Sequence, residues 1–146
     1  MAQTITIARP WHTWVVGILS LLFNSGGAFD YTMTHLHDPA YLKMVTPEQL
    51  AWIENFPVWA TSAWALGVWG AFGGSLLLLL RSRWAVLAFE IALVGLAGTT
   101  LYQWGISGMP ESLKTSGGMA FAAVIWIVTG LLLWYVMRMR ARGVLR

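Results

Sequence analysis

The chain has 146 residues, of which 58% are hydrophobic and only 10% are charged, and its mean hydropathy is +0.64. A soluble domain carries about 25% charged residues, so this composition excludes an ordinary soluble globule and indicates an all-α, polytopic membrane protein. The chain contains no cysteine, which excludes disulfides, thiolate metal sites and thiol redox chemistry. Although the net charge is +3, the arginines lie beside apolar runs, so we expect a lipid bilayer and no nucleic acid as the partner.

Four apolar runs along the chain are each long enough to cross a bilayer. They comprise about residues 11–33, 58–80, 84–106 and 117–137. At about 1.5 Å of rise per residue, the run at 58–80 would span about 34 Å, which exceeds a hydrocarbon core of about 30 Å. We therefore expect a single domain, residues 1–146, in which four transmembrane helices form an antiparallel bundle.

The loop after the first run is expected to carry short helices of its own. Asp38-Pro39 is typical of an N-cap followed by a proline at the first helical position, and T-P-E-Q from Thr46 to Gln49 is a capping box. About ten residues cannot cross a bilayer. We therefore expect an amphipathic helix over about residues 47–56 to lie flat on the outer surface, over the mouth of the bundle.

Small residues form one face on each of the two middle runs. Because only Arg81-Ser82-Arg83 joins these runs, their helices must be antiparallel neighbours. Packing the two small faces together would let the backbones approach closely. The two faces consist of Ala60, Ala63, Gly67, Gly70 and Gly74, and of Ala88, Ala92, Gly95, Thr99 and Tyr102.

Positive charge is divided unevenly between the two sides of this predicted bundle. Seven arginines fall on one side and two lysines on the other. Because basic residues stay on the cytoplasmic side, we expect a bacterial inner-membrane protein with both termini in the cytoplasm. The cytoplasmic set is Arg9, Arg81, Arg83, Arg138, Arg140, Arg142 and Arg146, and the opposite set is Lys43 and Lys114.

Four stretches of the sequence carry a family resemblance. They are F-N-S-G-G-A-F-D-Y-T-M-T (Phe23–Thr34), Y-L-K-M-V-T-P-E-Q-L (Tyr41–Leu50), F-P-V-W-A-T-S-A-W-A-L-G-V-W-G-A-F-G-G-S-L-L-L-L-L-R-S-R (Phe56–Arg83) and G-L-A-G-T-T-L-Y-Q (Gly95–Gln103). Together they resemble a family of small bacterial four-helix inner-membrane proteins, usually labelled hypothetical and sometimes "sugar transporter". The resemblance covers most of the chain and brings no established catalytic or binding residues with it.

Polar side chains collect in the outer half of the predicted bundle. In hydrocarbon, such groups must either bond across helices or line a wet cavity. A cavity covered by the 47–56 helix and walled by Trp59 and Trp64 would suit a small polar or amphipathic ligand, although interhelical bonding alone explains the serines and threonines equally well. The candidate ligand-binding residues are Asn24, Asp30, Tyr31, Thr61, Trp64, Thr99 and Gln103.

Glu90 is the most distinctive single residue of the predicted spans. It lies about 10 Å into the third helix, on a face opposite the Ala92/Gly95 stripe. A carboxylate at that depth costs about 2.5–3.5 kcal/mol unless it is paired, hydrated or protonated. We interpret Glu90 as a proton- or cation-coupling group; a structural hydrogen bond, or snorkelling toward Arg81 or Arg83, is the alternative.

Other chemistry is not expected from this sequence. His35-Leu36-His37-Asp38 has no recognised ligand spacing, and no histidine lies in the middle of a run, so we expect no metal, no haem and no other cofactor. No serine–histidine–acid set, paired carboxylates or phosphate-binding glycine loop is visible, so we expect no enzyme activity.

Two functions remain open at this stage. The first is binding or transport of a small solute through the outer polar cavity. Four helices are few for alternating access, and the strong charge bias disfavours dual topology, so transport would require a parallel homo-oligomer. The second is an accessory or structural subunit that packs onto a larger membrane complex through glycine-rich and tryptophan-rich faces.

Overall fold

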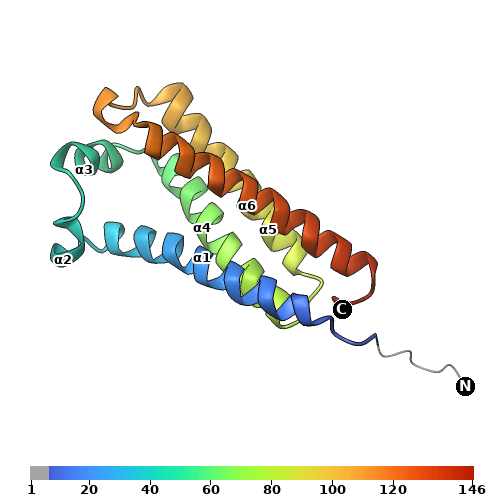
Figure 1. Cartoon of the computed structure of the whole chain (residues 1–146). Coiled ribbons are helices and arrows are strands. Elements are labelled where there is room, and N and C mark those ends of the chain that lie inside the picture. The colour runs from blue at the N-terminus through green and yellow to red at the C-terminus, as the bar shows by residue number, and fades with distance from the viewer. Residues whose placement is uncertain (1–6) are drawn as a thin grey trace, which may run out of the picture.

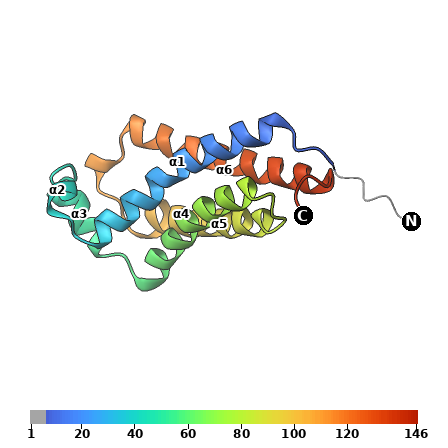
Figure 2. The same cartoon turned by 90° about the horizontal axis from the view of Figure 1, so that it is seen from below.

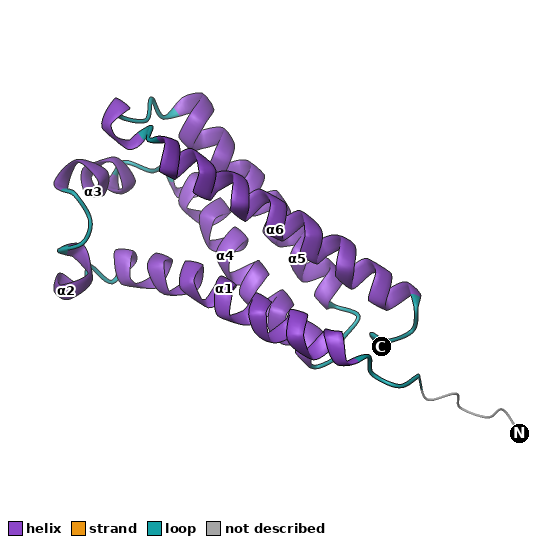
Figure 3. Cartoon of the chain, viewed as in Figure 1, coloured by secondary structure: helices purple, strands orange, loops and turns teal. Residues whose placement is uncertain are grey.

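A computed structural model describes residues 7–146, and every regular element in that range is a helix (Figures 1 and 3). The all-helical class is therefore confirmed. The long helices are α1 (Trp11–His35), α4 (Val58–Leu79), α5 (Ala85–Thr100) and α6 (Ser116–Ala141). The short ones are α2 (Pro39–Leu42), α3 (Pro47–Glu54), the π-helix η1 (Leu101–Ile106), which continues α5, and the 3₁₀ helix η2 (Glu111–Leu113).

Three stretches of the described chain are long and apolar enough to cross a membrane. They are α4, α5 together with η1, and α6. The first predicted span, α1, is not among them, although it contains 25 residues. Its sequence includes several polar side chains, of which Thr13, Ser20 and Asn24 are buried against the rest of the protein.

The backbones of α4 and α5 are in direct contact. A Cβ atom built on Gly95 would lie 2.4 Å from the backbone nitrogen of Gly67 and 2.5 Å from the carbonyl oxygen of Ala63. One built on Gly70 would lie 3.0 Å from the backbone nitrogen of Ala92. Because real Cβ atoms do not approach other atoms so closely, only glycine at position 95 permits this crossing. The predicted contact between the two small-residue faces is confirmed.

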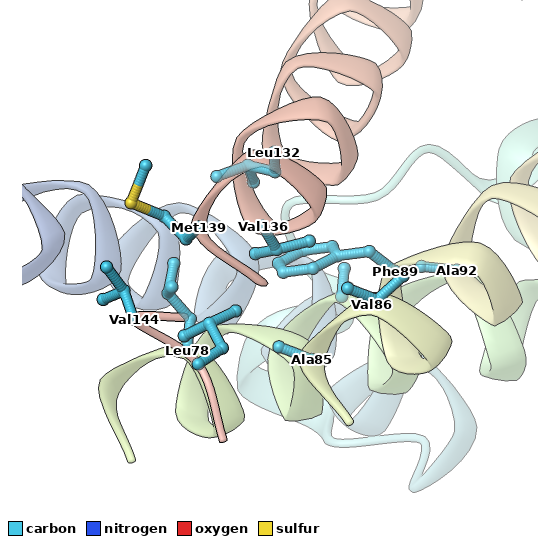
Figure 4. Packing of buried hydrophobic residues seen from close by; sticks show 11 residues of the cluster. Leu78, Ala85, Val86, Phe89, Ala92, Leu132, Val136, Met139 and Val144 are labelled. Atoms are coloured by element: carbon cyan, nitrogen blue, oxygen red, sulfur yellow. The ribbon is translucent and has the colours of Figure 1, made fainter. Parts of the chain in front are cut away.

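The apolar core lies at one end of the molecule, which we call the arginine end because Arg9, the 80–84 turn and residues 138–146 meet there. Phe89 of α5 is fully buried and packs with Val136 of α6 (Figure 4). The last residues fold back onto the turn: the Arg146 backbone N–H donates to the Arg81 carbonyl, and the Arg83 N–H donates to the Arg146 carbonyl, both at 2.8 Å.

Helices α1 and α6 meet at the arginine end and diverge toward the opposite end, which carries α2 and α3 (Figures 1 and 2). Where they meet, His12 Nδ1 and the Tyr135 hydroxyl form a hydrogen bond of 2.6 Å. At the opposite end, His37 Nε2 lies 3.1 Å from Glu54 Oε1, which links the end of α1 to α3. Helices α1 and α6 are therefore linked at the arginine end, and the end of α1 is linked to α3 at the opposite end.

The short helices begin at the caps that the sequence predicts. The Asp38 carboxylate accepts a hydrogen bond of 2.8 Å from the Tyr41 backbone N–H, which starts α2. The Thr46 hydroxyl accepts one of 3.2 Å from the Gln49 N–H, which starts α3. Each cap satisfies a backbone donor that the first helical turn leaves unpaired.

We expect Gly95→Ala to lower the melting temperature of the protein, because the added methyl group would force α4 and α5 apart. Overpacking of this kind costs about 1–3 kcal/mol. Gly130→Ala is the matched control, since its Cβ would meet no described heavy atom within 4 Å. Far-UV circular dichroism during heating, in one detergent, measures both variants. Equal melting temperatures would show that the α4–α5 contact is not as close as described.

Candidate functional site

A cavity of about 410 Å³ lies between α1, α4, α5, η1 and α6. Its lining on the α5–η1 side includes Ala92 and Gln103, which are separated by about 16 Å of helical rise. Small-molecule sites in proteins are typically clefts of about 300–1,000 Å³. The cavity is therefore large enough for a small ligand and is elongated along the helices.

A cluster of polar side chains adjoins the end of this cavity that is nearer the arginine end, which we call the deep end. Asn24 of α1, which is 8% exposed, donates from Nδ2 to Ser75 Oγ of α4 at 3.0 Å and to Ser20 Oγ at 3.3 Å. The Ser75 hydroxyl donates to the Ala71 carbonyl at 2.8 Å, so Ser20, 2.5 Å from Ser75 Oγ, must be the donor of that pair. The cluster joins α1 to α4 and orients the Asn24 amide.

The remaining polar atom of Asn24, its carbonyl oxygen Oδ1, has no hydrogen-bond partner within the described chain. Asn24 is one of the lining residues, and no described residue donates a hydrogen bond to Oδ1. Within residues 7–146, the side-chain N and O atoms that are fully buried and lack a hydrogen-bond partner all belong to Arg9. Asn24 Oδ1 is not among them, so this atom retains some accessible surface. Asn24 therefore brings an unpaired hydrogen-bond acceptor to the lining of the cavity.

Aromatic rings form much of the wall. Trp126 of α6 donates from its indole N–H to Thr100 Oγ1 of α5 at 3.1 Å, so the polar group of this ring is satisfied within the protein. Trp64 of α4 packs edge-on against Tyr31, with 5.0 Å between ring centroids. The aromatic side chains that line the cavity are Phe23, Trp64, Trp104, Phe121 and Trp126.

The π-helix η1 positions the end of the cavity nearest α3. The Ser107 backbone N–H donates to the Tyr102 carbonyl at 2.8 Å, a bond between residues five apart that widens the turn. Gln103 and Trp104, within this turn, both line the cavity. The Gln103 side-chain amide makes no hydrogen bond to another described residue. Single π-turns within α-helices are frequent at functional sites.

Four of the seven predicted ligand-binding residues, Asn24, Trp64, Thr99 and Gln103, line this cavity. Asp30 does not, because its carboxylate accepts a hydrogen bond from the Tyr41 hydroxyl of α2. Burial, followed by this hydrogen bond, raises the pKa of Tyr41 to about 12. Asp30 therefore holds α2 against α1.

Tyr31 and Thr61 line a separate, more open groove along α4. Tyr31 still contacts the cavity wall indirectly, since its ring packs on Trp64. Trp59, expected as a wall residue, is 47% exposed and does not line the cavity; its ring packs against Tyr102 instead. Tyr31, Thr61 and Trp59 were predicted to share the site because they count to similar depths along their helices, but similar depth does not place them in one cavity.

Glu90 is exposed on the outward face of α5 and is not a cavity-lining residue. The flanking side chains Leu87, Ile91 and Val94 are exposed on the same helix. Among the described residues Glu90 forms no ion pair with Arg81, Arg83 or any other basic residue. Its coupling role stays a prediction, and any such role would not involve direct contact with a molecule in this cavity.

The contribution of α6 was missed by the sequence interpretation. Phe121, Ile125 and Thr129 all line the cavity and are spaced four residues apart, so they share one helical face. Trp126 adjoins this stripe. A polar threonine in line with aromatic residues on the last helix was the signal that could have identified the fourth wall.

None of the described residues that line the cavity is charged. Over the same part of the chain, no group of three or more histidine, aspartate or glutamate side chains could hold a metal ion. His35 and His37 instead bind backbone carbonyl groups of α1, at Tyr31 and His35 respectively. The site therefore offers hydrogen bonding and apolar contact.

No protein-family model, curated protein or solved structure matches this chain. The resemblance to small four-helix inner-membrane proteins therefore stays a prediction.

Proposed function

We propose that this chain is an integral membrane protein with four spans that binds a small molecule in the cavity between its long helices. The observation that carries the proposal is the cavity of about 410 Å³, which combines aromatic walls with an unpartnered acceptor on Asn24. Apolar cavities with a few convergent polar groups are the usual form of small-molecule sites. Transport would add movement of the bound molecule, and the cavity supports binding more directly.

The distribution of side chains on α1 supports its role as the fourth span. Its polar residues Thr13, Ser20 and Asn24 are buried, whereas the outward face is apolar. A helix of this kind has reduced hydropathy but would expose little polar surface to lipid. The exposed apolar residues of α1 are Trp11, Trp14, Val15, Ile18, Leu19, Leu22, Phe23 and Phe29.

The arginine end supports a cytoplasmic location for both termini in a bacterial inner membrane. Arg81 donates to the carbonyl oxygens of Ile7 and Val144, at 3.1 Å each, so both ends of the described chain lie beside the 80–84 turn. Seven arginines gather near this end of the chain path. Under the positive-inside rule, that end faces the cytoplasm.

We expect reporter fusions to place both termini on the cytoplasmic side. Four spans return the chain to its starting side, whereas crossing by α4, α5 and α6 alone would leave the termini on opposite sides. Green fluorescent protein fused to either end should therefore fluoresce, and alkaline phosphatase fused to either end should be inactive. An active phosphatase at one end would refute the four-span arrangement.

We expect Gly26→Leu to remove a bound small molecule, because Gly26 lines the cavity and its Cβ would meet no described heavy atom within 4 Å. The leucine would occupy cavity volume without a backbone clash and should lower ligand occupancy about tenfold, equivalent to ~1.4 kcal/mol. Native mass spectrometry of gently extracted protein measures the mass of any small molecule that remains bound and the fraction of protein that carries it.

Gly73→Leu is the matched control for this variant. Gly73 also has open space at its Cβ position but lies on α4 away from the cavity lining. Its retained mass should equal that of the wild type. Equal retention by Gly26→Leu and Gly73→Leu, or no retained molecule on the wild type, would contradict the proposal.

A second candidate function, an accessory subunit of a larger membrane complex, is favoured by the exposed carboxylate of Glu90. In lipid this group would cost about 2.5–3.5 kcal/mol unless a partner neutralised it. A basic side chain from a neighbouring subunit would do so, and the exposed Leu87, Ile91 and Val94 would supply apolar contact.

We expect, for that second function, that Glu90→Gln releases a stoichiometric partner during purification in mild detergent. Glu111→Gln is the control, because Glu111 is exposed and pairs locally with Lys114 at 2.6 Å. Size-exclusion chromatography with mass detection measures the complex. A wild-type protein that purifies without a partner would leave no support for the accessory role.

A further inference from the structure

We propose that the cavity takes an uncharged amphiphile, a molecule with an elongated apolar body and a hydroxyl group that donates a hydrogen bond to Asn24 Oδ1. This inference rests on the proposed function and specifies the chemical class of its ligand. Three features of the cavity carry it: the charge of the lining, the direction of its hydrogen bonds, and its shape.

The lining excludes charged ligands. None of its residues within the described chain is acidic, basic or a histidine. An ion transferred into such a site would lose its hydration without gaining a counter-charge, which is strongly unfavourable. Glu90, a charged residue of α5, is exposed on the outward face and cannot compensate. Carboxylates, phosphates and ammonium ions are therefore disfavoured.

Three polar side chains of the lining have committed their protons to the protein, whereas the Thr100 hydroxyl and the Gln103 amide have not. The Thr99 hydroxyl donates to the Gly95 carbonyl at 2.9 Å, and the Thr129 hydroxyl donates to the Ile125 carbonyl at 2.7 Å. Each hydroxyl has one proton, so both threonines have only acceptor capacity left for a ligand. Asn24 has likewise committed its amide nitrogen to Ser75, which leaves Oδ1 as an acceptor.

These acceptors require a ligand that donates. A hydroxyl group satisfies that requirement without carrying charge, whereas a ketone, ether or ester would leave Asn24 Oδ1 unpaired. An acceptor left unpaired in apolar surroundings is costly, so the protein itself gains from the hydrogen bond. The deep, buried position of Asn24 places the hydroxyl at the end of the cavity farthest from α3.

The shape of the cavity suits an elongated apolar body. About 16 Å of helical rise separates Ala92 from Gln103 along its α5–η1 wall. Between these ends the wall is formed by rings such as Trp126 and Phe121, while Gly26 keeps the facing wall of α1 flat. A chain or narrow ring system lying along the helices would contact this surface throughout its length.

The proposal can be tested with three photoreactive probes that share one diazirine-bearing ten-carbon chain and differ only in the head group: an alcohol, a carboxylate and an ammonium. Full-length protein in lipid nanodiscs is irradiated with each probe, and labelled peptides are identified by mass spectrometry. We expect the alcohol to label residues 92–104 and 121–129 about tenfold more than either charged probe.

Two variants connect that labelling to the cavity. Asn24→Ala removes the acceptor and should reduce labelling by the alcohol about tenfold, toward the level of the charged probes. Because this variant also loses its hydrogen bonds to Ser20 and Ser75, Gly26→Leu provides a second test that leaves the cluster intact and should reduce labelling about tenfold. Gly73→Leu should label as the wild type does.

The outcomes distinguish a failure of the proposed ligand class from a failure of the proposed function. Equal or stronger cavity labelling by the carboxylate or the ammonium would overturn the ligand class and leave the proposed function standing. Labelling of these peptides by none of the three probes would overturn both. Competition by an unlabelled monoacylglycerol or by an unlabelled short-chain alcohol then distinguishes a membrane lipid from a free solute as the source of the hydroxyl.

Discussion

The direct contact between the backbones of α4 and α5 is the constraint on which the rest of the structure depends. With Gly95 lying on Gly67 and Ala63, these two helices form one rigid pair. Helix α1 then packs on α4, where Gly17 accepts the Leu79 side chain, and α6 packs on α5 around Phe89. Because α1 packs on α4 and α6 packs on α5, neither α1 nor α6 fills the cavity that lies between the long helices.

Side-chain size explains why that space is filled at one end and left open at the other. At the arginine end, large residues such as Phe89 and Val136 interdigitate between α5 and α6. Farther along, several of the facing positions are small, as at Gly26, Gly27 and Ala92, while α1 and α6 diverge (Figure 1). Because protein interiors are close-packed, we expect this apolar cavity to hold another molecule. Small residues at these positions and the divergence of α1 from α6 both leave room for the cavity.

The sequence allowed the all-helical class and the α4–α5 contact to be predicted, because helical spacing determines which residues share a face. The site was predicted only in part. Counting residues from the membrane surface gives the depth of Asn24 and Tyr31 but not the direction in which each points around its helix. Asn24 therefore faces the cavity, whereas Tyr31 lies in a separate groove. Hydropathy, likewise, depends on composition alone and does not show that the polar residues of α1 point toward the other helices.

The widened turn of η1 was invisible to any pattern of hydrophobicity, since a π-turn differs from an α-turn by a single residue. This has a consequence for how the gene can vary. Loss of one codon within residues 101–106 would remove the extra residue that the widened turn accommodates and would convert the segment to a regular α-helix. Gln103 and Trp104, which lie within this turn and line the cavity, would then lose their present positions in the wall. Descendants of this gene that keep the cavity should therefore tolerate substitutions here far better than a change in length.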